Sequence, residues 1–174
     1  MKIKFLFPTS IGLSDGIITA LILAAGGILN GGGIDLFISI KISFGSAFAG
    51  TFSYFIAQYA GLNEELHRTA KQLNLKSTNY LLKGKLGNEI FLESLSGSII
   101  AAICGFFGAL IPLLSSLVIR NNIIIPLVFS YVSLGILGLF ISKTTSGRSS
   151  FWIAVMITIG IIVTIAGFYL KLIV

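Results

Sequence analysis

The feature that most constrains the fold is a run of nineteen residues, 11–29, whose only charged side chain is Asp15. As an α-helix it would be roughly 28 Å long at ~1.5 Å per residue, about the thickness of a bilayer's hydrocarbon core. A carboxylate inside such a segment costs about 2.5–3.5 kcal/mol on insertion scales. Asp15 is either a tolerated acid near a helix end, two turns after Thr9 and Ser10, or a cation or proton site facing a protein interior. We favour the second interpretation.

The composition is typical of an integral membrane protein. Of the 174 residues, 55% are hydrophobic and only 10% are charged, and the mean hydropathy is +1.00. Soluble domains carry about a quarter charged residues. The net charge of +6 therefore does not indicate a nucleic-acid partner. The single Cys104 excludes a disulfide framework, and the short apolar run before Pro8 predicts no cleaved signal peptide.

We expect an all-α, polytopic membrane protein with five transmembrane helices. The predicted spans are residues 11–29, 36–61, 94–119, 123–142 and 151–173. Thr9 or Ser10 is expected to cap the first helix. The second span is rich in small residues, which allow close approach between helices, and Pro112 is expected to kink the third.

A polar segment, residues 62–93, separates the second and third spans. It contains four of the six acids, the only histidine and five basic residues. We predict two or three short cytosolic helices here, because the segment is too short for an independent core. The expected organisation is residues 1–61 for helices 1 and 2, residues 62–93 for the insertion, and residues 94–174 for helices 3 to 5, all in one membrane domain.

The basic residues predict the orientation. With five spans, nine basic residues fall on one side of the membrane and two on the other. The nine are Lys2, Lys4, the five in segment 62–93, Lys143 and Arg148; the two are Arg120 and Lys171. Because basic residues collect in the cytosol, the N-terminus and residues 62–93 should be cytosolic and the C-terminus outside. The membrane would be the cell membrane in a prokaryote, and a vacuolar or other organelle membrane in a eukaryote.

The sequence offers no enzyme constellation, and we expect neither catalysis nor a cofactor. His67 is the only histidine, so a serine–histidine–acid arrangement would need a residue of the cytosolic segment. Asp15 has no second intramembrane aspartate with which to form an aspartyl dyad. No phosphate-binding GxxxxGK[ST] loop is present.

Two weaker patterns could bind a metal ion. Glu64 and His67 are spaced i and i+3, half of the pattern used in di-iron helical bundles, and a solvated helix face is the alternative. Glu89 and Glu93 share a helix face at i and i+4 and could hold a hard divalent ion together with Glu64 or Glu65. Pairing of these acids with neighbouring lysines is the alternative for the second pattern.

Several stretches resemble the vacuolar iron transporter family. Ser14-Asp15-Gly16, followed by an apolar run to Gly26, is similar to that family's first-span signature. The stretch from Gly108 to Leu114, GALIPLL, resembles its GALxPLL motif. The last two spans also resemble the family's, from Gly135-x-x-Gly138 through the Ser146-Gly147-Arg148-Ser149 loop to Gly167-Phe168-Tyr169. The resemblance covers nearly the whole chain outside residues 62–93.

The resemblance implies a homodimer that moves ferrous iron, and often manganese, out of the cytosol in exchange for protons. It assigns a transport role to Asp15. At the second span, this chain has Lys41 where the family has a glutamate and Ala49 where the family has a metal-contacting methionine. The glutamate-rich cytosolic helices of the family are shortened here.

Two hypotheses follow. The first is a divalent-metal/proton antiporter built around Asp15, since carboxylates and carbonyls suit Fe²⁺ or Mn²⁺. The second is a paralogue with the same scaffold but another cargo or none, acting as a regulatory or assembly membrane protein. Lys41 favours the second, unless it deprotonates when metal enters or directs its ammonium to the membrane interface. If it faced the ion, Lys41→Glu should strengthen metal binding.

Glycine spacing predicts where two copies of the chain would meet. Gly12 and Gly16, and again Gly27 and Gly31, are four residues apart in or beside the first span. Such spacing allows close contact between helices. The expected interface of the homodimer therefore includes this span, and the alternative is that these glycines pack against helices of the same chain.

Overall fold

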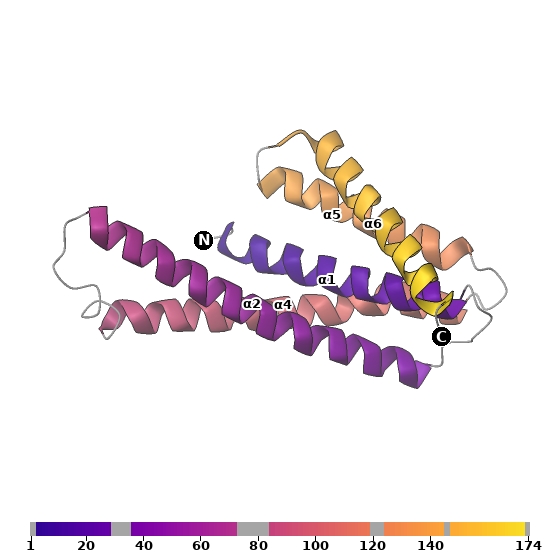
Figure 1. Cartoon of the computed structure of the whole chain (residues 1–174), viewed down its shortest axis with the longest axis horizontal. Coiled ribbons are helices and arrows are strands. Elements are labelled where there is room, and N and C mark those ends of the chain that lie inside the picture. The colour runs from indigo at the N-terminus through magenta and orange to yellow at the C-terminus, as the bar shows by residue number, and fades with distance from the viewer. Residues whose placement is uncertain (1–2, 29–35, 73–83, 119–123, 145–146, 173–174) are drawn as a thin grey trace.

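The computed structural model describes residues 3–28, 36–72, 84–118, 124–144 and 147–172. These residues form five α-helices, α1 (Ile3–Ile28), α2 (Leu36–Gln72), α4 (Lys85–Val118), α5 (Ile124–Thr144) and α6 (Ser149–Leu172). Successive helices run in alternating directions through one bundle (Figure 1). The prediction of an all-α protein is confirmed.

Three of the described helices are long and apolar enough to cross a membrane. The qualifying stretches are Phe5–Ile22 in α1, Lys85–Ser115 in α4 and Ser149–Tyr169 in α6. A shorter apolar stretch, Leu127–Lys143, lies in α5. Many large apolar side chains of these helices face outward, among them Phe107, Phe129 and Ile162. These features are consistent with the membrane protein expected from the composition.

Helices α2 and α4 extend well beyond the rest of the bundle. They contain 37 and 34 residues, so each is more than 50 Å long at ~1.5 Å per residue. Their ends project past the beginning of α1 (Figure 1). We call residues 62–72 of α2 and 85–93 of α4 the α2–α4 extension.

The prediction of separate short helices in segment 62–93 is wrong for the described part of that segment. Residues 62–72 continue α2 and residues 85–93 begin α4 without a break. The physical reason is that the chain becomes polar after Gly61 but remains rich in helix-forming residues such as Leu62, Glu64 and Glu65. The remainder of the predicted insertion, residues 73–83, lies outside the described residues.

The first helix also begins earlier than expected. It starts at Ile3 and contains Pro8, so Thr9 and Ser10 do not cap it. Their hydroxyl groups donate hydrogen bonds of 2.7 Å and 2.8 Å to the carbonyl oxygens of Phe5 and Leu6, one turn earlier in the same helix. Pro8 is the sixth residue of α1, so it lacks one intrahelical hydrogen bond and its ring crowds the carbonyl group of Lys4.

One face of α1 packs against α4 through small residues. A Cβ atom built on Gly12 would clash with the carbonyl oxygen of Ala101, and one built on Gly16 would clash with that of Gly105. On α4, a Cβ on Gly108 would lie 2.8 Å from the carbonyl oxygen of Leu13. The two backbones can approach this closely only because these positions lack side chains. Gly12 and Gly16 therefore contact a helix of the same chain, the alternative to a dimer contact.

The adjacent face of α1 packs against α5 and α6. Ile17 and Leu21 form a buried cluster with Leu134 and Leu137 of α5 and Met156 of α6. Helix α1 thus lies at the centre of the bundle, between α4 and the α5–α6 pair. Its third face is directed toward α2.

Candidate functional site

Asp15 lies near the middle of α1. It follows Ile3 by twelve residues and precedes Ile28 by thirteen, which puts ~18 Å of helix on either side. The interpretation of Asp15 as a tolerated acid near a helix end assumed that the helix begins at about Thr9. The helix begins about two turns earlier, so Asp15 is not near its end. In the structure of the single chain, Asp15 is exposed.

The Asp15 carboxylate faces Gly50 of α2. A Cβ atom on Gly50 would lie 2.9 Å from Oδ2 of Asp15, so the carboxylate occupies the space that any other residue's side chain would fill. A flanking contact lies on the same boundary between helices, where the rings of Phe7 and Tyr54 are 6.4 Å apart. Ile42 packs against a buried cluster that joins Ala20 of α1 to Ala109 and Leu113 of α4. We call this antiparallel boundary the α1–α2 seam.

A buried hydroxyl group without a partner lies one turn from Gly50. Ser46 is 8% exposed, and its Oγ has no hydrogen-bond partner among the residues that the structure describes. By contrast, Ser43 on the same helix donates a 2.9 Å hydrogen bond to the carbonyl oxygen of Ser39. An unsatisfied buried hydroxyl costs about 1–3 kcal/mol, and such a group in a native protein commonly marks an ordered water or an ion.

Asp15 supplies carboxylate oxygens to the α1–α2 seam, and the Ser46 hydroxyl lies one turn from its contact Gly50. Carboxylate and hydroxyl oxygens suit protons and hard cations rather than soft metals. Two side chains do not complete a coordination sphere, and no group of three or more His, Cys, Asp or Glu residues is placed to hold a metal within the described ranges. The remaining ligands of a cation would have to be backbone oxygens, water or groups of a second copy.

Lys41 is directed away from Asp15. Its side chain is exposed, and its ammonium lies 4.4 Å from the centroid of the Phe37 ring, one turn nearer the start of α2. Lys41 also precedes Gly50 by nine residues, or ~13 Å along the helix. This orientation matches the alternative in which the lysine is directed to the membrane interface. Ala49 is likewise exposed.

The acidic residues predicted to bind metal lie in the α2–α4 extension. Glu64 forms a 2.8 Å ion pair with Arg68, and both side chains are largely exposed. Glu65, His67 and Glu89 are exposed as well. For Glu64, this geometry is that of a solvated helix face.

Glu93 differs from the other acids of the extension. It is half-buried and close enough to the Tyr54 hydroxyl to interact with it electrostatically. Tyr54 is 7% exposed, and its ring covers Gly97 of α4. Sequence reasoning identified Glu93 but missed Tyr54. It also missed Gly50, which contacts Asp15, and Ser46, which lies one turn from Gly50. Both belong to the second span, whose many small residues were noted from the sequence.

No protein-family model matches the chain, and no curated protein matches it at a significant level.

Proposed function

We propose that the protein moves a cation across a membrane through the α1–α2 seam, with Asp15 as the group that binds it. The observation that carries this proposal is a central, exposed carboxylate in contact with Gly50, one helical turn from the unpartnered buried hydroxyl of Ser46. Intramembrane acids are costly and commonly mark ion or proton pathways. A non-functional carboxylate would be expected at a helix end, where water reaches it.

The proposed cargo is Fe²⁺ or Mn²⁺, exported from the cytosol in exchange for protons. A carboxylate can hold either a proton or a hard divalent ion, so the two compete for Asp15 and their fluxes become coupled. The resemblance of the sequence around Ser14-Asp15-Gly16 to the vacuolar iron transporter family supports this choice of ion.

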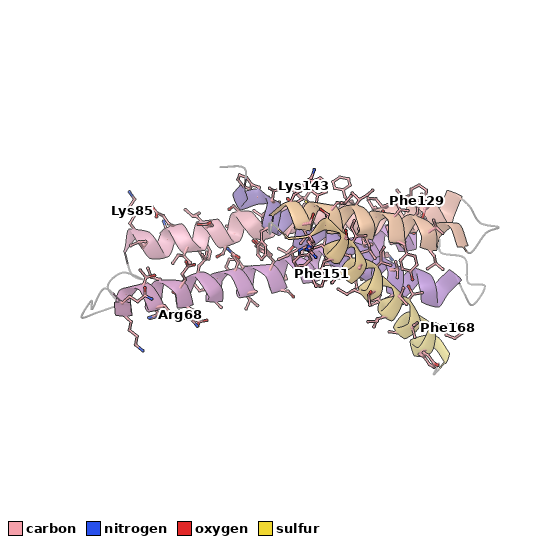
Figure 2. All side chains as sticks on the ribbon, turned by 90° about the horizontal axis from the view of Figure 1, so that it is seen from above. Arg68, Lys85, Phe129, Lys143, Phe151 and Phe168 are labelled. Atoms are coloured by element: carbon pink, nitrogen blue, oxygen red, sulfur yellow. The ribbon has the colours of Figure 1, made fainter. Side chains whose placement is uncertain are left out.

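The proposed topology has five spans. Five antiparallel helices support it, as does the distribution of basic residues (Figures 1 and 2). Arg68 and Lys85 lie near the free end of the α2–α4 extension in Figure 2, and Phe129 and Phe168 lie toward the opposite end. By the positive-inside rule the extension is cytosolic, together with the N-terminus, and the C-terminus is outside.

We further propose a homodimer that covers Asp15. An exposed carboxylate at mid-helix would otherwise meet lipid, at a cost of about 2.5–3.5 kcal/mol. A second copy across the seam would shield it and add a second set of oxygen donors. The spacing of Gly12 and Gly16 no longer supports this dimer, because both pack against α4 of the same chain; in the second pair, Gly27 and Gly31, the latter lies outside the described residues. Its support is now the exposure of Asp15.

Transport by purified protein in vesicles tests the proposal. We expect Fe²⁺ and Mn²⁺ to move under an imposed pH gradient with the wild type and not with Asp15→Asn. Stability should be equal or higher in the variant, because removing a charge from a membrane-spanning segment removes its insertion cost. Lys85→Gln is the control, since this charged side chain is exposed in the extension and is not a candidate metal ligand. Normal transport by Asp15→Asn would place the ion pathway elsewhere.

A second candidate function is a non-transporting paralogue with a regulatory or assembly role. The Glu64–Arg68 ion pair favours it, because Glu64 is then not available to a metal ion. The same vesicles separate the two candidates. Absence of Fe²⁺ and Mn²⁺ movement with folded wild-type protein would support the second.

A further inference from the structure

The outward face of α2 carries one basic side chain within a stripe of phenylalanines. Phe37, Lys41, Phe44, Phe48 and Phe52 are spaced by three or four residues and so share one helix face. All five are exposed. The Lys41 ammonium contacts the ring of Phe37. It forms no ion pair with a carboxylate among the residues that the structure describes. A positive charge is therefore presented at one end of an apolar surface.

An apolar groove begins one turn from Lys41 and follows the boundary between α2 and α4. Its volume is about 460 Å³, within the range of roughly 300–1,000 Å³ typical of small-molecule pockets. Its main walls are Phe44, Phe48 and Phe52 of α2 and Ile103, Phe106 and Phe107 of α4. The rings of Phe44 and Phe106 meet edge to face with their centroids 6.0 Å apart, which joins the two walls at the end nearest Lys41.

Lys41 and the groove together span about one bilayer leaflet. From Lys41 to Phe52 the helix advances eleven residues, or ~16 Å, about half of a ~30 Å hydrocarbon core. Lys41 lies five residues after Leu36, the first residue of α2. Its flexible stem can therefore carry the ammonium to the level of the lipid headgroups.

We propose that this groove binds one acyl chain of an anionic phospholipid whose phosphate pairs with Lys41. The phenylalanine walls accept any apolar chain, whereas the ammonium selects a negatively charged headgroup. One basic residue near a membrane surface gives about a fivefold preference for an anionic lipid. The inference rests on the proposed crossing of the membrane by α2.

Quenching by brominated lipids tests the site. The reporter is Phe48→Trp in a Trp152→Phe background, since Trp152 is the only tryptophan. Phe48 is 56% exposed, so the larger ring can be accommodated; Phe52→Trp is a second reporter in the same groove. In phosphatidylcholine vesicles, brominated phosphatidylglycerol should quench the reporter at about fivefold lower mole fraction than brominated phosphatidylcholine. Lys41→Gln should remove the difference, and Lys143→Gln, at an exposed lysine of α5, should not.

The alternative outcomes are distinct. Equal quenching by the two lipids, or a preference that survives Lys41→Gln, overturns the lipid site. A third reporter, Ile56→Trp, lies on the same helix outside the groove, at a side chain that is 64% exposed. Quenching at Ile56 with none at Phe48 means that a second copy or another helix fills the groove. No quenching at either position means that α2 lies outside the bilayer, which refutes the proposed span as well.

Discussion

The close packing of α1 on α4 makes a quantitative prediction for Gly16→Ala. A Cβ atom at this position would lie 2.8 Å from the backbone nitrogen of Ala109 and 3.0 Å from the carbonyl carbon of Gly105, and it would clash with that group's oxygen. All three are backbone atoms, so none can rotate away. Because carbon contacts are optimal at about 3.5–4.0 Å, the two helices must separate by about 1 Å.

Such a separation weakens the whole contact between the two helices. A gap of 0.5–1 Å already removes about a quarter to a half of the dispersion attraction between facing atoms, and overpacked sites in proteins typically lose about 1–3 kcal/mol. For a chain of this length, 1 kcal/mol corresponds to about 2–4 °C in the unfolding midpoint. We therefore expect Gly16→Ala to lower the midpoint by several degrees, measured by thermal unfolding in detergent.

Gly45→Ala is the matched control. Gly45 is on α2, and a Cβ atom there would have no atom within 4 Å. The same substitution should then be neutral or stabilising by up to about 1 kcal/mol, the difference in helix propensity between the two residues. If Gly16→Ala and Gly45→Ala unfold at the same temperature, the reasoning about the α1–α4 contact is refuted.

Three further predictions concern the seam, the extension and the topology. Gly50→Ala should alter metal movement without changing the unfolding midpoint, because its methyl group would meet only the far end of a flexible carboxylate side chain; a large drop in the midpoint would contradict this. Arg68→Ala should cost at most about 1 kcal/mol in thermal unfolding, since both partners of its ion pair with Glu64 are exposed. Cysteines introduced at Ser77 and Val174 should react with an impermeant reagent from opposite sides of the membrane, and labelling from one side alone would reject five spans.

The positions of most helices could be predicted from the sequence. Residues 123–142 and 151–173 were expected to be helical, and α5 and α6 differ from these ranges by two residues or fewer at each end. The agreement arises because long apolar runs bounded by polar turns leave little choice of element. The prediction failed at Gly61, where polarity changes but helix propensity does not. It also failed at Pro8, which was interpreted as a residue that precedes the helix.

The partners of the site residues could not be predicted in the same way. Asp15 and Gly50 are 35 positions apart, and their contact depends on how two antiparallel helices are aligned and rotated. Sequence spacing gives the face of a single helix but not the register between two. The same limit applies to the exposure of Lys41, because the rotation of α2 about its axis decides which of its faces packs against the other helices.

The continuity of α2 from the α1–α2 seam to the end of the extension has a mechanical consequence. Gln72 follows Gly50 by 22 residues within one unbroken helix, a distance of ~33 Å. A tilt of about 10° around the Gly50 contact would move the far end of the helix by ~6 Å, if the helix behaves as a stiff rod of this length. Helix α2 is thus a lever that pivots where Gly50 meets the Asp15 carboxylate. A small change in helix tilt at the seam would therefore appear as a displacement of several ångströms at the end of the extension.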